Sequence, residues 1–143
     1  MATFLDTSAI YALLDERDPV HHLADQAFRF LVEADELVTT NYVALEASAL
    51  MQRRFGFDAA RDLHVRFLPL VDVEWIDAAL HRTAVTSLLA AGNRNVSLVD
   101  WSSFVFMRER GIDDVFTFDR DFAAQGFNVV PSPPAPDPAA IST

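Results

Sequence analysis

The sequence predicts an α/β fold: a doubly wound, three-layer (α/β/α) parallel sheet of about five strands. Short apolar segments alternate along the chain with longer segments whose apolar residues recur every three or four positions, the spacing of an amphipathic helix. The short segments are apolar on both sides, which is typical of strands buried on both faces of a sheet. The chain has 143 residues, 51% hydrophobic and 22% charged, which suits one domain with its own core.

The predicted elements follow one another as strand, helix and strand in a repeated pattern. Thr7 and Ser8 are suited to cap the first helix and Asn41 a later one, while Gly56 and Gly111 are suited to end two others. The predicted strands cover residues 2–6, 36–40, 70–73, 114–118 and 128–130. The predicted helices cover 9–14, 20 to about 33, 41–55, 58–68, 76 to near 92, 97–110 and 120–125.

We expect a folded domain over residues 1–131 and a flexible, proline-rich tail over 132–143. Five of the seven prolines fall between Pro131 and Pro138, a composition that favours an extended chain. The chain contains no cysteine, so nothing indicates an oxidising compartment. It begins with a strand-like segment rather than a signal sequence, and no apolar stretch approaches the roughly 18 residues that span a bilayer. These features predict a cytoplasmic protein with no membrane segment.

The charge composition excludes several chemistries. The formal net charge is −10, and all eleven basic residues are arginines. Without lysine the chain has neither a P-loop nor a Schiff-base nucleophile. The negative charge also opposes non-specific binding to nucleic acid.

Four acidic residues lie in apolar segments, where a core is expected to form: Asp6, Glu46, Asp100 and Asp119. Asp6 and Asp119 end predicted strands, and Glu46 and Asp100 lie about one turn into predicted helices. Because ligands of such sheets bind beyond the carboxyl ends of the strands, all four side chains are expected at one edge of the sheet. Carboxylates removed from water cost several kcal/mol each and repel one another unless a cation holds them.

Each acid also has a purely local explanation. Asp6 is a candidate turn residue or helix cap, Asp119 a candidate N-cap, and Asp100 fits a capping box with Ser97. Glu46 is the hardest to explain locally, because it lies within a helix on an expected apolar face with Tyr42, Leu45, Ala49 and Leu50. Its alternative is pairing with a buried arginine. Without a shared cation, four acids at the same edge of the sheet would need four separate local explanations. A shared cation is therefore the favoured interpretation.

The donor set predicts a hard cation. Carboxylate oxygens suit Mg²⁺ or Mn²⁺, whereas a zinc hydrolase is poorly supported without cysteine or a histidine motif. Two such ions about 3.5–4 Å apart can activate water and stabilise the leaving oxygen in phosphoryl displacement.

The ordered set of motifs resembles the PIN domain, and more narrowly the VapC toxins of bacterial toxin–antitoxin pairs. The resemblance covers residues 1 to about 131 and rests on Asp6-Thr7-Ser8, Glu46, Ser97-Leu98-Val99-Asp100-Trp101 and Phe116-Thr117-Phe118-Asp119-Arg120-Asp121-Phe122.

That resemblance implies a PIN-like sheet and a Mg²⁺- or Mn²⁺-dependent endoribonuclease (a hydrolase) that acts on an RNA substrate. It also implies a homodimer and inhibition by a small cognate antitoxin protein. Position by position, it implies that Asp6, Glu46, Asp100 and Asp119 are the catalytic, metal-binding acids. Thr7, Ser97, Thr117 and Asp121 are candidate supporting residues.

Other residues have weaker functional interpretations. Arg53, Arg54, Arg94 and Arg120 are candidate phosphate contacts, although solvated charges are the simpler interpretation. The four histidines are expected to be packed or exposed rather than ligands, and Trp75 and Trp101 to be packing residues. The aromatic stretch of Trp101, Phe104 and Phe106 is expected in the core or at a dimer surface.

Two alternative functions remain open at this stage. One is a non-catalytic, PIN-like protein-binding module, which the four retained acids argue against. The other is a phosphatase with Asp6 as nucleophile. Such enzymes usually have a second aspartate two residues further on, where this chain has Ser8, and a lysine, which this chain lacks.

Overall fold

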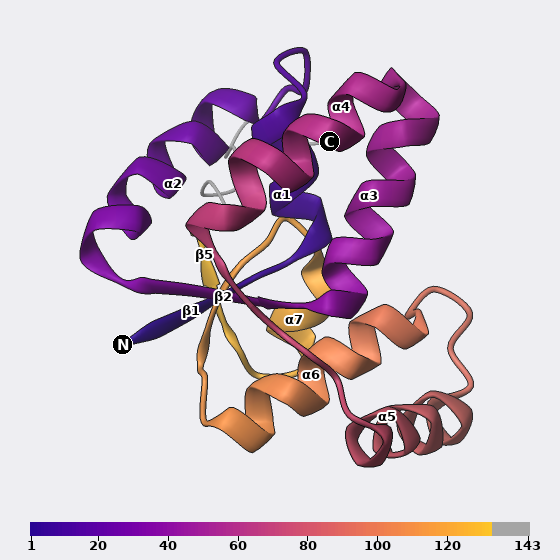
Figure 1. Ribbon diagram of the computed structural model, residues 1–143. Helices are drawn as coiled ribbons and strands as arrows, with labels where there is room; N and C mark the ends of the chain where they lie inside the picture. The colour runs from indigo at the N-terminus through magenta and orange to yellow at the C-terminus, as the bar shows by residue number, and fades with distance from the viewer. Residues whose placement is uncertain (133–143) are drawn as a thin grey trace, which may run out of the picture.

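The computed structural model describes residues 1–132, which form a five-stranded parallel sheet between two layers of helices (Figure 1). The spatial order of the strands is β3-β2-β1-β4-β5. The strands are β1 (Ala2–Leu5), β2 (Glu36–Thr40), β3 (Asp72–Glu74), β4 (Asp114–Phe116) and β5 (Asn128–Val130). The helices are α1 (Thr7–Leu14), α2 (His21–Ala34), α3 (Asn41–Phe55), α4 (Phe57–Asp62), α5 (Ala78–Ala91), α6 (Leu98–Arg110) and α7 (Arg120–Ala124). The predicted fold class and five strands are confirmed.

The winding of the chain reverses at β1. Strands β2 and β3 lie on one side of β1, and β4 and β5 lie on the other; Phe4 pairs with Val38 and with Val115. Right-handed crossovers therefore place α1 to α4 on one face of the sheet and α5 to α7 on the opposite face (Figure 1). The carboxyl ends of β1 and β4 flank the switch point, where parallel sheets bind their ligands.

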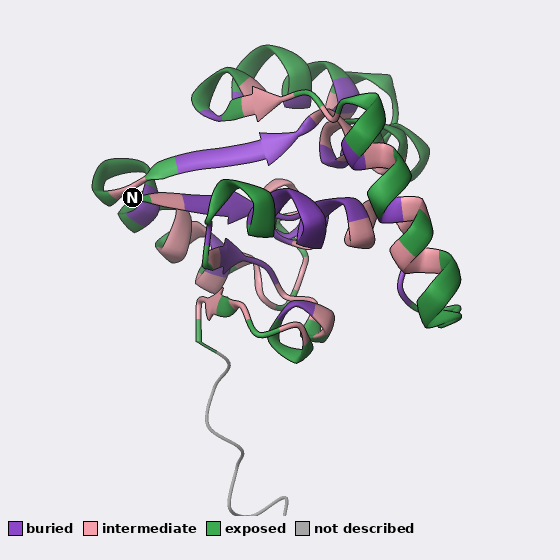
Figure 2. Ribbon diagram, turned by 90° about the horizontal axis from the view of Figure 1, so that it is seen from below, coloured by how far each residue is buried: buried purple, intermediate pink, exposed green. Residues whose placement is uncertain are grey.

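The core is aromatic. Phe4, Phe104, Phe106, Phe116 and Phe122 are fully buried, and the Phe104 and Phe122 rings pack edge to face with centroids 4.9 Å apart. Burial is concentrated on the central strands, and exposed residues cover the outer sides of the helices (Figure 2). Of the two alternatives given for this aromatic stretch, core or dimer surface, the core is correct for Phe104 and Phe106.

Two capping assignments are wrong. Helix α3 is capped by Thr40, whose Oγ1 accepts from the Val43 amide at 3.3 Å, rather than by Asn41. The Asn41 side chain instead accepts from the Ile76 amide at 2.7 Å and ties the start of α3 to the segment after β3. Helix α1 starts at Thr7 itself, with Asp6 as its N-cap, so the alternative of Asp6 as a helix cap is correct.

The segment after α3 is less regular than predicted. The helix expected over 58–68 ends as α4 at Asp62 and continues as a π-helical turn, η1 (Leu63–Phe67), and a 3₁₀ turn, η2 (Leu68–Leu70). Pro69 has no amide hydrogen to donate, which favours this ending. Strand β3 consequently begins at Asp72, two residues later than predicted.

Two expectations about burial are also wrong. The residues that α3 buries are Val43, Ala47 and Met51, whereas Leu45, expected on the same apolar face as Glu46, is 72% exposed. Trp75, expected to be a packing residue, is 78% exposed.

The proline-rich segment 132–143 lies, apart from Ser132, outside the described residues. Within residues 1–132, no helix has the length and apolar composition needed to cross a bilayer.

Replacing Phe104 by alanine is expected to lower the free energy of unfolding by about 3–5 kcal/mol, because the ring is fully buried against Phe122. Urea unfolding followed by circular dichroism measures this. Trp75→Ala is the matched control and should cost less than about 1 kcal/mol, since Trp75 is 78% exposed. Equal losses in both variants would contradict the described core.

Candidate active site

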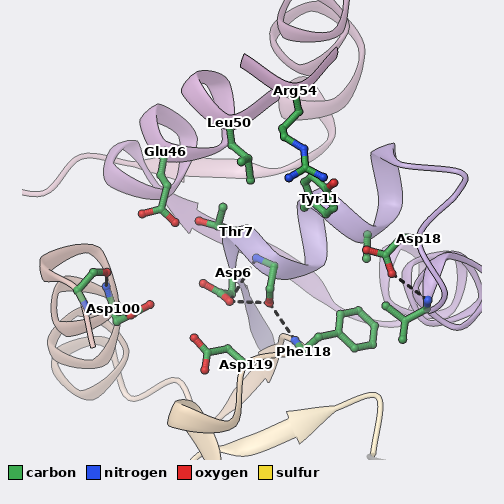
Figure 3. A pocket seen from close by; sticks show the side chains of 14 residues that line it. Asp6, Thr7, Tyr11, Asp18, Glu46, Leu50, Arg54, Asp100, Phe118 and Asp119 are labelled. Carbon is green, nitrogen blue, oxygen red and sulfur yellow. Dashed lines mark hydrogen bonds between the residues drawn. The ribbon is translucent and has the colours of Figure 1, made fainter. Parts of the chain in front are cut away.

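A cavity of about 570 Å³ opens at the switch point, beyond the carboxyl ends of β1 and β4 (Figure 3). All four predicted acids line it: Asp6, Glu46, Asp100 and Asp119. They come from the end of β1, from α3, from the first turn of α6 and from the segment between β4 and α7. The predicted convergence of these side chains is therefore observed.

Asp6 is the most deeply buried of the four, at 3% exposure, and its Oδ2 is held by three donors. The Ser8 hydroxyl and the Thr117 hydroxyl each donate to it at 2.8 Å, and the Ser8 amide donates at 3.4 Å. All three bonds end on the same oxygen, which leaves Oδ1 for another ligand. The Ser8 hydroxyl also accepts from the Phe118 amide at 2.9 Å, so one small network joins the ends of β1 and β4.

Burial raises the pKa of Asp6 from its ordinary 3.8 to about 6. The hydrogen bonds from Ser8 and Thr117 oppose this rise, and the negative charge of Asp100 adds to it. Without a cation, ionisation of Asp6 is therefore less favourable in this site than in water.

Asp100 and Asp119 each cap a helix with one oxygen. Asp100 Oδ2 accepts from the Ser97 amide at 2.9 Å, and the Ser97 hydroxyl accepts from the Asp100 amide at 3.2 Å, which is the predicted capping box of α6. Asp119 Oδ1 accepts from the Asp121 amide at 2.9 Å as the N-cap of α7. Local capping and convergence on the cavity are thus compatible, because each carboxylate has a second oxygen.

Asp121 joins this group. Asp100, Asp119 and Asp121 each offer one carboxylate oxygen, and these three oxygens lie within 4.8 Å of one another. Burial and the charge of Asp119 raise the pKa of Asp121, and burial and the charge of Asp119 likewise raise that of Asp100. Asp121, a candidate supporting residue, is partly buried and lies beside two of the four acids.

Glu46 projects from α3 toward the same space, with Thr7 beneath it (Figure 3). Burial raises the pKa of Glu46, the Thr7 hydroxyl lowers it, and Asp100 and Asp119 raise it further. Thr7 Oγ1 is buried, yet within residues 1–132 it has no hydrogen-bond partner of normal geometry. The Thr7 hydroxyl therefore interacts only weakly with Glu46 and keeps hydrogen-bonding capacity for a further group beside that carboxylate.

The donors in this cavity fit a hard divalent cation. The side-chain ligands available are carboxylate and hydroxyl oxygens, and none of the four histidines is among the described lining residues. Asp100, Asp119 and Asp121 would hold a cation directly, and Asp6 and Glu46 lie across the same cavity.

The candidate supporting residues have different positions. Thr7 and Ser97 line the cavity, and Thr117 is fully buried behind it, where it donates to Asp6. Of the four candidate arginines, only Arg54 lines this cavity among the described residues. The role of Ser8 as a link between Asp6 and Phe118 was not predicted, since it was interpreted only as a helix cap.

Residues 3–128 match the PIN domain, so the chain belongs to the PIN domain family. The resemblance inferred from the motifs is therefore confirmed.

Among individual relatives, the 23S rRNA-specific endonuclease VapC20 of Mycobacterium tuberculosis is 35% identical over 125 residues, which cover 87% of this chain and 94% of that protein. The crystal structure of VapC20, a sarcin–ricin loop cleaving toxin, superposes with a TM-score of 0.80 at 34% identity and covers 89% of this chain and 96% of that chain.

More distant structures share the fold alone. FitAcB from Neisseria gonorrhoeae has a TM-score of 0.66 at 17% identity and covers 90% of this chain and 96% of its own. VapBC2 from Rickettsia felis, solved with a promoter DNA fragment, has a TM-score of 0.62 at 12% identity and covers 90% of this chain and 97% of its own.

Asp6→Asn is expected to stabilise the metal-free protein at pH 7 by about 1–3 kcal/mol. The upper value is the free energy that corresponds to raising the pKa of Asp6 from 3.8 to about 6. The gain is smaller where the asparagine accepts weaker hydrogen bonds from Ser8 and Thr117 than the carboxylate does. Because the folded state binds the Asp6 proton more tightly, the stability of the wild type falls as pH rises from about 4 to about 6. The variant should show a shallower fall over that window.

Urea unfolding in chelator at several pH values measures this effect. Asp58→Asn is the control, because the Asp58 side chain is 90% exposed, and its pH profile should follow the wild type. An Asp6→Asn variant less stable than the wild type at pH 7 would contradict the assigned burial penalty.

Proposed function

We propose that this chain is a Mg²⁺- or Mn²⁺-dependent endoribonuclease that hydrolyses RNA phosphodiester bonds, and that it acts as the toxin of a toxin–antitoxin pair. One observation carries the proposal: three carboxylate oxygens, from Asp100, Asp119 and Asp121, lie within 4.8 Å of one another, and Asp100 and Asp119 also line the acidic cavity at the sheet's switch point. Membership of the PIN domain family and the likeness to VapC20 support it.

In this proposal, Asp6, Glu46, Asp100 and Asp119 form the catalytic, metal-binding set, and Asp121 adds a fifth carboxylate. Divalent ions, when bound, supply activation of water and stabilisation of charge on the leaving oxygen. Ser8 and Thr117 orient Asp6 by donating to its Oδ2, and Ser97 orients Asp100 through the capping box. Thr7 supplies a hydroxyl beside Glu46.

The relative's substrate is the first candidate for this chain. VapC20 is specific for 23S rRNA and cleaves the sarcin–ricin loop, and at 35% identity we propose ribosomal RNA as the substrate class to test first. We further propose a small cognate antitoxin as partner and a homodimeric assembly. The antitoxin proposal is supported by fold neighbours such as VapBC2, whose crystal structure was solved with a DNA fragment from its promoter.

The wild type is expected to cut RNA in ribosomes or in total RNA when Mg²⁺ or Mn²⁺ is present and to stop in excess chelator. Asp100→Asn should lower the cleavage rate by about a hundredfold or more, because a ligand of the proposed cation is removed while the side-chain shape is kept. Mapping of RNA 5′ ends after incubation with purified protein measures both effects.

Asp58→Asn is the matched acid-to-amide control and should leave cleavage unchanged, since Asp58 lies exposed at the start of α4, and it does not line the described cavity. Cleavage that persists in chelator, or that survives Asp100→Asn, would contradict a metal-dependent site at these residues. Tight binding of a partner protein without any cleavage would favour the non-catalytic module instead.

A further inference from the structure

The four acids of the candidate site, Asp6, Glu46, Asp100 and Asp119, occupy one end of the cavity. The other end is lined by Tyr11 from α1, by Leu50 and Arg54 from α3 and by Phe118 from the segment after β4 (Figure 3). Tyr11, Leu50 and Phe118 are partly buried, so their surfaces form walls of the cavity rather than free projections. The cavity therefore continues from a carboxylate cluster to an aromatic end that carries one arginine and one further acid, Asp18, whose Oδ1 accepts from the Val20 amide at 2.9 Å.

Arg54 is the only basic residue among those that line the described cavity, against five acidic ones. Its guanidinium lies over the Tyr11 ring, 5.8 Å from the centroid, and Tyr11 packs in turn against Phe55 with ring centroids 5.9 Å apart. Arg54 makes no salt bridge with any residue in the part of the chain that the structure describes. Its guanidinium thus contacts an aromatic ring and, among the described residues, forms no ion pair, either with Asp18 or with the four acids of the site.

Arg54 shares a helix face with Glu46. Glu46, Leu50 and Arg54 are four residues apart in succession, so all three project from α3 toward the cavity (Figure 3). Eight residues of α-helix place the Cα atoms of Glu46 and Arg54 roughly 12 Å apart along the axis. A polynucleotide whose scissile linkage lies at the carboxylates would carry its neighbouring phosphates along this face toward Arg54.

We propose that Arg54, stacked on Tyr11, binds the phosphate of a nucleotide next to the cleaved linkage, and that the rings of Tyr11 and Phe118 contact the base or sugar of that nucleotide. The proposal rests on the proposed ribonuclease function and adds a binding subsite to it. A guanidinium is well suited to a phosphate, because its planar set of donors can hold two phosphate oxygens. Aromatic rings beside it offer stacking surfaces that accept any base.

An acidic peptide could also pair with Arg54, but the lining favours a nucleotide. Two aromatic side chains and one arginine surround the same space, and a phosphodiester chain necessarily brings a second phosphate when the first is at the acidic end. A peptide carboxylate would pair with Arg54 but would make no favourable contact with the carboxylate cluster in the same cavity.

The first test compares Arg54→Gln with its neighbour Arg53→Gln. Both residues are exposed on the last turns of α3, but Arg53 does not line the described cavity. The substrate is an oligonucleotide that spans the cut mapped with the wild type, and single-turnover kinetics separate binding from the maximal cleavage rate. Arg54→Gln should raise the apparent Kd about tenfold or more and change the maximal rate by less than about threefold. Arg53→Gln should change the Kd by less than about twofold.

The dependence of binding on salt gives a second readout. Loss of one phosphate contact to a single strand should lower the slope of log K against log salt by about 0.7 in Arg54→Gln relative to the wild type. A merely structural role for Arg54 would leave that slope unchanged.

Neutral methylphosphonate linkages, placed one at a time beside the cut, locate the contact. With the wild type, one neutral linkage should weaken binding about tenfold, and with Arg54→Gln the same linkage should have little further effect. Additive losses at every linkage would overturn the assignment of Arg54 to a phosphate.

The outcomes separate the two proposals. Cleavage by the wild type, with Arg54→Gln indistinguishable from Arg53→Gln, overturns the Arg54 subsite alone. Unchanged RNA cleavage together with weaker binding of a partner protein by Arg54→Gln would also overturn it and assign the arginine to protein recognition. Failure of the wild type to cut any RNA in Mg²⁺ or Mn²⁺ overturns the ribonuclease function and, with it, the subsite.

Discussion

The carboxylates at the switch point repel one another, and the way they are held decides what this site can do. Asp6, Asp100 and Asp119 each use one oxygen to cap a helix: Asp6 for α1, Asp100 for α6 and Asp119 for α7. The hydrogen bonds that begin these helices thus also fix the carboxylates, and each keeps a second oxygen. Because the carboxyl ends of β1 and β4 are adjacent, Asp6 and Asp119 cannot separate without breaking the sheet, and Asp100 lines the same cavity from the first turn of α6. The accumulated negative charge is therefore built into the fold, and a cation can neutralise it.

The rest of the molecule is consistent with that constraint. A net charge of −10 opposes association with RNA, so positive charge must be supplied locally. Divalent ions would supply it at the acidic end of the cavity, and Arg54 supplies it at the other. The fully buried phenylalanines beneath the site, together with the Ser8 bridge between Asp6 and the Phe118 amide, make a rigid support. A site of this kind needs rigidity, because repelling groups on mobile loops would move apart.

Sequence reasoning predicted the sheet, the order of its elements and the convergence of four acids, because periodicity and the ends of strands are local signals. It misplaced the α3 cap, since Thr40 and Asn41 are both good caps and only the tertiary bond from the Ile76 amide assigns Asn41 elsewhere. It placed Glu46 on an apolar face because Leu45 suggested one, yet Leu45 is 72% exposed. Ser8 acquires its role only through its contact with Phe118, far along the chain. Arg54 was one of four candidate arginines, and only its contact with Tyr11 and its place in the cavity lining distinguish it from Arg53, which no local pattern predicts.

The most direct test of the central claim is isothermal titration calorimetry of the metal-free protein with Mn²⁺ and with Mg²⁺ near pH 6, in buffers of different ionisation enthalpy. The account predicts saturable binding with release of protons, because the pKa of Asp6 is about 6 and a ligand must give up its proton to hold a cation. The Asp100→Asn variant should bind far more weakly. Absence of binding heat at millimolar ion, or binding unaffected by Asp100→Asn, would contradict the account.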